Sequence, residues 1–216
     1  MIIAIYKPLG MTSHDVVKRV REATGERRVG HAGTLDPLAE GVLVVGVGRE
    51  ATRKLHEVVG GEKEYVATIR LGATSVTDDE EGPKTERAGV AVPPRKEVAS
   101  ALRKFVGAIK QTPPRYSAVK VRGKPSYAYA RSGKDIALKP RMVEVKDIKL
   151  VAYEYPLITL RVVTGPGVYI RSIARDLGET LGTGGYLAGL VRTRVGEFGI
   201  DAARPLDRIS KALGVQ

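Results

Sequence analysis

The chain has 216 residues, 43% of them hydrophobic, and a formal net charge of +12 at pH 7. It lacks cysteine, which excludes disulfides, thiolate nucleophiles and thiolate metal sites, and its three histidines lie too far apart in sequence for a zinc-binding pair. Apolar runs are much shorter than the roughly 20 residues of a membrane-spanning helix. No segment has the features of a signal peptide, so we expect a cytoplasmic protein that contacts no membrane.

In the first third of the chain, the apolar pattern predicts a strand at 2–6 and then a helix that Thr12 or Ser13 caps and Gly25 ends. The glycine-rich stretch 30–41 is expected to be a tight, irregular loop. Within it, Pro37 favours an extended conformation for Asp36, so the loop can present one carboxylate, although an ordinary turn has the same composition. A buried strand at 42–47, a helix near 51–59 and a half-buried strand at 64–71 follow.

Farther along, residues 77–84 are acidic and turn-rich, which predicts a surface loop. The next element is an amphipathic helix after Pro93 or Pro94, with Val98, Ala101, Leu102, Phe105 and Val106 on its buried face. Strands are expected at 142–145, 148–152 and 157–163. A helix that buries Ile173, Ala174 and Leu177 comes next, and a short helix at 205–213 ends the pattern. Without repeats or linkers, residues 1–216 are expected to form a single domain of mixed α and β structure.

Positive charge is concentrated in residues 101–150, which hold thirteen lysines and arginines against three acidic residues. Three tyrosines, Tyr116, Tyr127 and Tyr129, alternate with these cations. Basic and aromatic side chains together suit phosphate contact and base stacking, so this segment is expected to face RNA. Gly182–Gly185 and Gly46–Gly48 lack the residues of a nucleotide-binding loop, and we expect neither cofactor nor metal.

Five segments together resemble the TruB family of tRNA pseudouridine-55 synthases. These are Lys7–Ser13 (KPLGMTS), Gly30–Ala39 (GHAGTLDPLA), Lys63–Tyr65 (KEY), Pro113–Lys120 (PPRYSAVK) with Gly123, Tyr127, Ala130 and Arg131, and Gly167–Ser172 (GVYIRS). The resemblance implies an α+β fold, in which a central mixed, mostly antiparallel sheet is flanked by helices. It also implies a cofactor-free and metal-free enzyme, expected to act as a monomer, that converts the uridine at position 55 in the tRNA T-loop into pseudouridine.

The resemblance also assigns residues to this reaction. Asp36 is the expected catalytic carboxylate, which could stabilise charge on the sugar, attack the sugar carbon or accept a sugar proton. Arg171 is expected to keep Asp36 ionised, and Tyr65 to stack on the base and take part in proton transfer. An ordinary surface arginine and a half-buried strand tyrosine are the structural alternatives for these two residues.

The remaining expected site residues bind or support the substrate. His31 is expected to enter the RNA stack when the base flips out, unless it is simply a solvent-facing loop residue. Tyr169 would lie near the carboxylate, Leu190 would line the base pocket, and Lys7 would support the catalytic region. Lys120 and Arg131 belong to the RNA-facing basic segment. Asp79 matches an acidic residue of the family, although Val76 departs from the family pattern.

Many family members carry a C-terminal RNA-binding domain of the PUA type. This sequence ends a few turns past Phe198, so we expect that domain to be absent. Two alternatives to a stand-alone tRNA enzyme follow from the same residues. One is a catalytic subunit directed by guide RNA and accessory proteins, and the other is a non-catalytic RNA-binding or RNA-folding protein.

Overall fold

The computed structural model describes residues 1–134 and 136–209, which form two compact units. Unit 1 comprises residues 1–66, 163–166 and the described residues from 190 onward. Unit 2 comprises residues 67–162 and 167–189. Strands β4 (Lys63–Leu71), β11 (Leu157–Thr164) and β12 (Gly185–Val195) contribute residues to both. The predicted single domain over residues 1–216 stays a prediction.

The strands of unit 1 follow the order β14-β1-β3-β12, with β2 also paired to β3 and β13 to β12. Their bounds are β1 (Ile2–Lys7), β2 (Val29–Ala32), β3 (Ala39–Val47), β13 (Phe198–Gly199) and β14 (Arg204–Pro205). Strand β3 pairs antiparallel with β1 and β2 but parallel with β12. The sheet is therefore mixed. Two 3-10 turns, Ile200–Ala202 and Leu206–Arg208, lie near its end.

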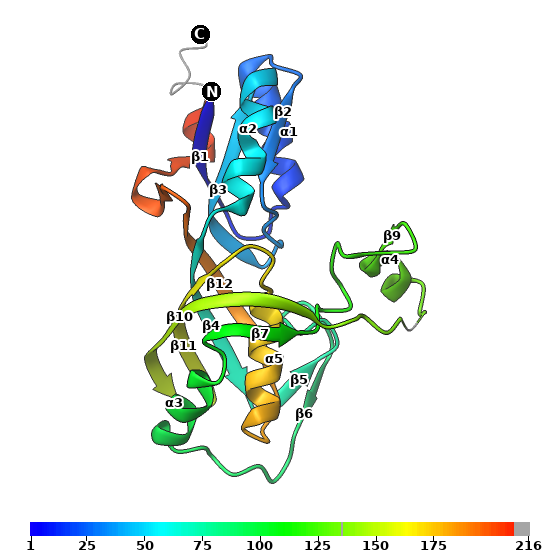
Figure 1. Cartoon of the computed structure of the whole chain (residues 1–216), viewed down its shortest axis with the longest axis vertical. Helices are drawn as coiled ribbons and strands as arrows, with labels where there is room; N and C mark the ends of the chain where they lie inside the picture. Colours follow the sequence, from blue (N-terminus) through cyan, green and yellow to red (C-terminus); the bar gives the residue numbers. More distant parts are fainter. Residues whose placement is uncertain (135, 210–216) are drawn as a thin grey trace. The chain divides into compact units, whose positions relative to one another are not determined.

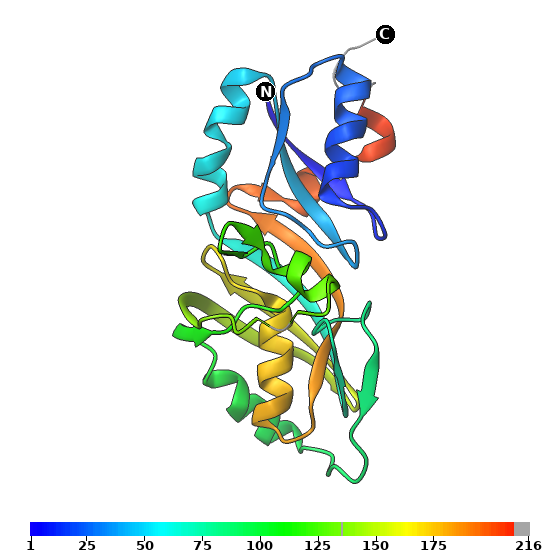
Figure 2. The same cartoon turned by 90° about the vertical axis from the view of Figure 1, so that its right-hand side faces the viewer.

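Helices α1 (Ser13–Thr24) and α2 (Arg49–Gly60) cover opposite faces of these strands, as Figure 2 shows. Because side chains alternate along a strand, β1 and β3 can supply apolar residues to both helices. The α1 face buries Ile3, Ile5, Leu43 and Val45 with Val16, Val17 and Val20. The α2 face buries Ala4, Val42 and Val44 with Leu55. Thr12, one of the two predicted caps, forms a capping box with Asp15 at the start of α1, and Gly25 ends that helix as predicted, in the left-handed conformation.

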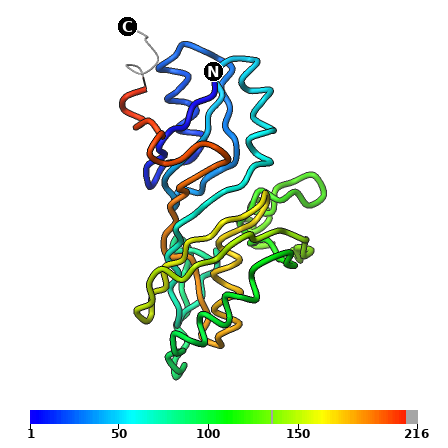
Figure 3. The backbone as a smooth tube through the Cα atoms, turned by 60° about the vertical axis from the view of Figure 1, so that its left-hand side comes forward, coloured from blue at the N-terminus to red at the C-terminus, as the bar shows by residue number. Residues whose placement is uncertain are grey.

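The strands of unit 2 follow the order β12-β4-β11-β10-β7. Strands β7 (Gly107–Gln111), β10 (Arg141–Glu154) and β11 (Leu157–Thr164) accompany helices α3 (Arg95–Arg103) and α5 (Ile170–Thr180), which Figure 1 labels. Strands β10 and β11 run side by side, as the tube in Figure 3 makes clear. Two short hairpins, β5 (Ala73–Ser75) with β6 (Lys84–Glu86) and β8 (Lys120–Val121) with β9 (Lys124–Pro125), precede α3 and α4 (Ser126–Arg131) respectively.

The expected α+β class with a mixed sheet and flanking helices is confirmed, and most element bounds agree within a few residues. Four local predictions need correction. Residues 142–145 and 148–152 belong to one strand, β10, and residues 29–32 form β2 rather than loop. Helix α3 ends at Arg103, so Val106 lies outside it and is exposed. In the predicted 205–213 helix, residues 206–208 form a 3-10 turn and 210–213 lie outside the described residues.

Candidate active site

The loop that carries Asp36 is held by backbone contacts on both sides of that residue. Ser13 Oγ donates to the Leu35 carbonyl at 3.0 Å and accepts from the Leu35 amide at 2.8 Å. The Gly10 amide donates to the Pro37 carbonyl at 2.8 Å. Gly10, in the β1–α1 connection, and Ser13, at the start of α1, therefore fix the residues immediately after and before Asp36. A half-buried carboxylate held this way has the rigid support that a catalytic group needs.

Lys7, at the end of β1, is fully buried. Its Nζ donates to the carbonyls of Pro8, at 3.0 Å, and Met11, at 2.6 Å, and so ties together the turn that supports the Asp36 loop. Burial lowers the pKa of Lys7 to about 8, against the opposing effect of the Asp36 and Glu40 carboxylates. Lys7 thus supports the turn next to Asp36, and the negative charge of Asp36 raises the pKa of Lys7.

Tyr65, on β4, is 7% exposed and lies within the electrostatic reach of two groups of unit 1. Burial raises the pKa of the Tyr65 phenol, whereas the charge of Arg192 and a side-chain hydrogen bond from it act in the opposite direction. The Asp36 carboxylate raises that pKa further. Tyr65 is therefore within electrostatic range of Asp36 and of Arg192, a residue that the sequence reasoning missed. A shared catalytic role of Tyr65 and Asp36 stays a prediction.

Leu190 and His31 also belong to unit 1. Leu190 lies on β12 opposite Ala39, three residues beyond Asp36, and is half-buried. His31 lies on β2 opposite Val45 rather than in a loop. Burial lowers the pKa of His31, and the charge of Arg192 lowers it further. The imidazole is therefore neutral at pH 7.

Arg171 belongs to unit 2, at the start of α5, and is buried with Asp79. Its NH1 lies 3.2 Å from Asp79 Oδ2 and donates to the Thr77 carbonyl, and its NH2 donates to the Tyr116 carbonyl at 3.0 Å. Asp79 also accepts hydrogen bonds from the Thr77 hydroxyl and the Glu81 amide. The prediction of a surface loop at 77–84 is therefore wrong at Asp79, because this carboxylate pairs with a buried guanidinium. The predicted pairing of Arg171 with Asp36 stays a prediction.

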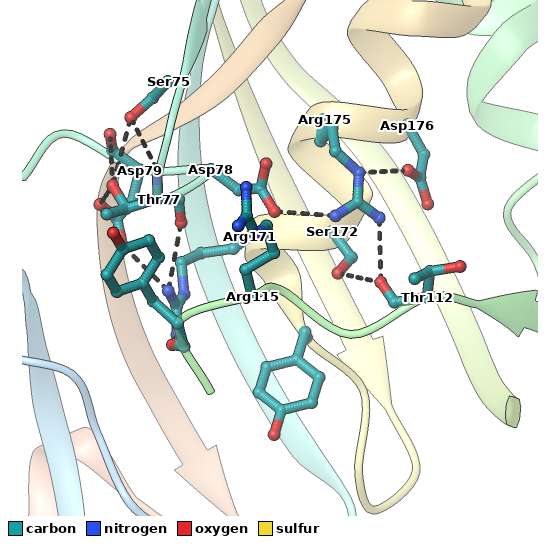
Figure 4. A network of polar contacts seen from close by, with 12 residues as sticks. Ser75, Thr77, Asp78, Asp79, Thr112, Arg115, Arg171, Ser172, Arg175 and Asp176 are labelled. Carbon is teal, nitrogen blue, oxygen red and sulfur yellow. Dashed lines mark hydrogen bonds and ion pairs between the residues drawn. The ribbon is translucent and has the colours of Figure 1, made fainter. Parts of the chain in front are cut away.

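One turn along α5, Arg175 repeats the arrangement (Figure 4). Its NH1 lies 2.8 Å from Asp78 Oδ2, and its Nε lies 2.9 Å from Asp176 Oδ1. Its NH2 donates to the Thr112 carbonyl. Ser172 Oγ donates to the same carbonyl at 2.8 Å. Burial raises the pKa of Asp78, opposed by the Arg175 charge. These contacts attach α5 to residues 77–79 and to Thr112 of the basic segment.

Tyr169, immediately before α5, is held by a reciprocal amide contact. Gln111 Nε2 donates to the Tyr169 carbonyl at 3.1 Å, and Gln111 Oε1 accepts from the Tyr169 amide at 2.8 Å. The Arg141 guanidinium lies 5.2 Å from the centroid of the Tyr169 ring. Gln111 of β7 therefore fixes the backbone of Tyr169 within unit 2, and the Arg141 cation of β10 lies over the face of its ring.

The predicted RNA-facing residues Lys120 and Arg131 are exposed on β8 and at the end of α4. The Arg131 guanidinium lies 5.4 Å from the Tyr127 ring centroid. Arg122 and Lys134 line an open hollow with Tyr129. Cations and tyrosines of the basic segment are thus close together in space as well as in sequence.

Among the described residues, no three histidine, aspartate or glutamate side chains are grouped as metal ligands would be. In the same part of the chain, every helix is too short or too polar to cross a bilayer.

Comparison with known proteins identifies the family. The model of the TruB family pseudouridylate synthases, N-terminal domain, matches residues 21–170. A protein of Thermobifida fusca is 47% identical over 217 residues, which cover 97% of this chain and 74% of the relative. One of Leifsonia xyli is 49% identical over 218 residues, which cover 98% and 72%. The chain belongs to the TruB family of pseudouridylate synthases, and both relatives are named tRNA pseudouridine synthase B.

Solved structures agree with this assignment. A chain in the crystal structure of a Cbf5–Nop10–Gar1 complex is 29% identical to this one and superposes with a TM-score of 0.76. The match covers all of this chain and 56% of the other.

The sequence reasoning did not single out Arg192, Gln111 or Arg175. A signal for Arg192 was present, because the twofold period of a strand places it on the same face as Leu190. A fully buried charge on that face indicates a functional site. Gln111 and Arg175 act across distances of about 60 residues or more in sequence, which no local pattern reveals.

Proposed function

We propose that this chain converts uridine 55 in the T-loop of tRNA into pseudouridine, with Asp36 as the catalytic carboxylate. The single observation that carries the proposal is the rigidly held Asp36 loop next to Tyr65, in a chain of this family. A protein that only binds RNA would not need a carboxylate supported on both sides and grouped with a buried phenol. The non-catalytic alternative is therefore disfavoured.

The names of the relatives support tRNA as the substrate. Proteins named tRNA pseudouridine synthase B are 42–49% identical over nearly the whole chain, including two from Thermus thermophilus strains at 42%. The chain of the Cbf5–Nop10–Gar1 complex is 29% identical. Similarity thus favours an enzyme that acts on tRNA over a guide-RNA-directed subunit.

The reaction is an isomerisation. The bond from the sugar carbon C1′ to the uracil N1 breaks, the base turns in place, and C1′ joins to C5. The proton on C5 is then lost and N1 gains one, so no atom or electron is gained overall. Cleavage places positive charge on the sugar. Asp36 can stabilise that charge, attack the sugar carbon or accept a sugar proton, and all three roles require the carboxylate in its ionised form.

Tyr65 and Arg171 complete the proposed catalytic set. Burial raises the pKa of Tyr65, so the phenol keeps its proton at pH 7 and its neutral ring is suited to stacking on uracil. We also assign Tyr65 a part in proton transfer. Arg171 supplies positive charge that favours the ionised acid. Leu190 would line the base pocket, with Tyr169 near the reacting base.

Because the target base is stacked within a folded loop, it must leave the stack at a cost of a few kcal/mol. We assign His31, neutral and half-buried on β2, to the gap that the base leaves. We assign Lys120 and Arg131 to phosphates of the T-arm. The protein is proposed to work as a monomer in the cytoplasm and to need neither metal nor cofactor.

The test is incubation of the purified chain with unmodified tRNA transcript in buffer that contains EDTA. Nucleoside analysis should detect pseudouridine, and carbodiimide treatment followed by primer extension should map it to position 55. A transcript with cytidine at position 55 is the matched control and should gain none. Absence of pseudouridine from the wild-type transcript would refute the proposal. Pseudouridine elsewhere would refute the T-loop assignment alone.

A further inference from the structure

Arg192, on β12, is 1% exposed and is among the largest fully buried side chains of the protein. Its Nε donates to the Val42 carbonyl at 2.8 Å, and its NH2 donates to the Gly33 carbonyl at 3.0 Å. Its NH1 lies 3.5 Å from the Thr34 carbonyl. One side chain thus contacts β3 and both residues at the start of the loop that carries Asp36, about 150 residues away in sequence.

The backbone of Arg192 is fixed as firmly as its side chain. Arg192 lies opposite Gly41 in the parallel pairing of β12 with β3. A Cβ on Gly41 would lie 2.3 Å from the Arg192 carbonyl oxygen, so only glycine allows the two strands to come this close. The guanidinium therefore extends from a backbone that cannot shift relative to β3, and its planar fork reaches the loop with a defined geometry.

A purely structural role does not explain the positive charge. A guanidinium remains protonated at neutral pH, and burying a charge costs more than burying a hydrocarbon of similar size. The acidic groups that act on Arg192 are Tyr65 and Asp36, the two proposed catalytic residues of unit 1. Burial is the main cause of the lowered pKa values of Lys63 and His31, and the charge of Arg192 lowers both further. The charge of Arg192 therefore acts across this part of the unit.

We propose that Arg192 is a positioning residue for the isomerisation. Its guanidinium holds the Gly33–Thr34 backbone, and with it Asp36, and places a positive charge within electrostatic range of Tyr65. This inference rests on the proposed function, because positioning has meaning only if Asp36 and Tyr65 act on uridine.

The test compares Arg192→Lys and Arg192→Met with wild type. Lysine retains the charge but lacks the planar fork, and methionine retains the bulk without charge. Because a small displacement of a reacting group is costly, we expect single-turnover rates on tRNA to fall about 100-fold in both variants. Affinity for tRNA should stay within about threefold, since a fully buried side chain offers RNA no phosphate contact.

A third variant tests the guanidinium directly. Arg192→Ala leaves space where a guanidinium ion can bind, so millimolar methylguanidinium should restore part of its rate and leave wild type unchanged. Arg194→Met is the matched control on the same strand. Arg194 is partly exposed and pairs with Glu62 at 3.4 Å. The Arg194→Met variant should keep the single-turnover rate within about twofold of wild type.

If the wild-type protein forms no pseudouridine in tRNA, the proposed function is refuted, and this inference with it. With an active wild type, folded Lys and Met variants that react within threefold of its rate would overturn the positioning role. Failure of both variants to fold would also overturn it, because Arg192 would then serve stability alone. Loss of rate and of affinity in equal measure would assign Arg192 to binding instead.

Discussion

The guanidinium of Arg171 lies 3.2 Å from the carboxylate of Asp79, and both side chains are buried within unit 2. Asp79→Asn would remove one charge and leave the other without its counterion in a site with little water. Breaking a buried pair in this way should lower the free energy of unfolding on the order of 3 kcal/mol. Urea denaturation of the variant and of wild type measures the difference.

The exposed pair Lys18–Glu22 on α1 provides the control for that comparison. Its side chains are 71% and 64% exposed and 4.0 Å apart. Glu22→Gln should therefore change stability by less than about 0.5 kcal/mol. Equal effects of Asp79→Asn and Glu22→Gln would show that the buried pair contributes no more than an ordinary surface contact.

Asp36→Asn should abolish catalysis while leaving RNA binding nearly unchanged. The amide keeps the size of the side chain but cannot carry negative charge, attack the sugar or accept its proton. We expect the single-turnover rate to fall about 1000-fold or more, equivalent to roughly 4 kcal/mol of lost transition-state stabilisation. Tritium release from uridine labelled at C5 measures the rate, and filter binding measures affinity.

Glu40→Gln is the matched control for the Asp36 substitution. Glu40 lies four residues farther on, is half-buried, accepts a hydrogen bond from Tyr6 at 2.8 Å and, like Asp36, raises the pKa of Lys7. Its loss should change the rate by less than about fivefold, because it belongs to no proposed catalytic group. A large loss of rate in Glu40→Gln together with little loss in Asp36→Asn would mean that our assignment of the reaction to Asp36 is wrong.

Lys7 should make folding more favourable as pH rises. Burial lowers its pKa from the ordinary 10.5 to about 8, so between these values the unfolded chain holds this proton more tightly than the folded one. The penalty of burying the charge is present below pH 8 and disappears as the amine loses its proton. Relative to Lys7→Met, wild type should therefore gain about 2 kcal/mol of stability between pH 7 and 9.5.

Urea denaturation of wild type and Lys7→Met across that range gives the difference, and other titrating groups largely cancel. Lys54→Met, on the exposed surface of α2, is the control and should show no such change. A difference between wild type and Lys7→Met that stays constant with pH would mean that Lys7 keeps its proton in the folded protein.

The fold was predictable where signals are local. Helix α1 is an example, because Thr12, Asp15 and Gly25 carry its capping chemistry within fourteen residues. The candidate site was predictable only where a motif named it, as for Asp36 and Tyr65. The role of Arg192 and the burial of Asp79 could not be predicted, because each depends on partners far away in sequence. From its composition alone, the acidic stretch around Asp79 indicated a surface loop.

The basic segment should account for much of the salt dependence of RNA binding. Lys120, Arg122, Lys124 and Arg131 are all exposed on β8, β9, α4 and the connecting turn. Replacing all four with glutamine should weaken binding and reduce the slope of log K against log salt, by up to about 0.7 for each single-strand phosphate that the variant no longer neutralises. Affinity measured for a T-arm hairpin from 50 to 300 mM KCl gives both quantities.

Net charge alone also attracts RNA, so the control must lose the same charge elsewhere. Lys18, Arg19, Arg53 and Lys54 are exposed on α1 and α2 of unit 1. Replacing these four with glutamine also removes four positive charges, but in our assignment none of these side chains binds a phosphate. The slope of log K against log salt for this control variant should therefore stay close to that of wild type. Equal slopes in the two quadruple variants would mean that the basic segment attracts RNA only through the overall charge of the protein, and its assignment to the T-arm would be wrong.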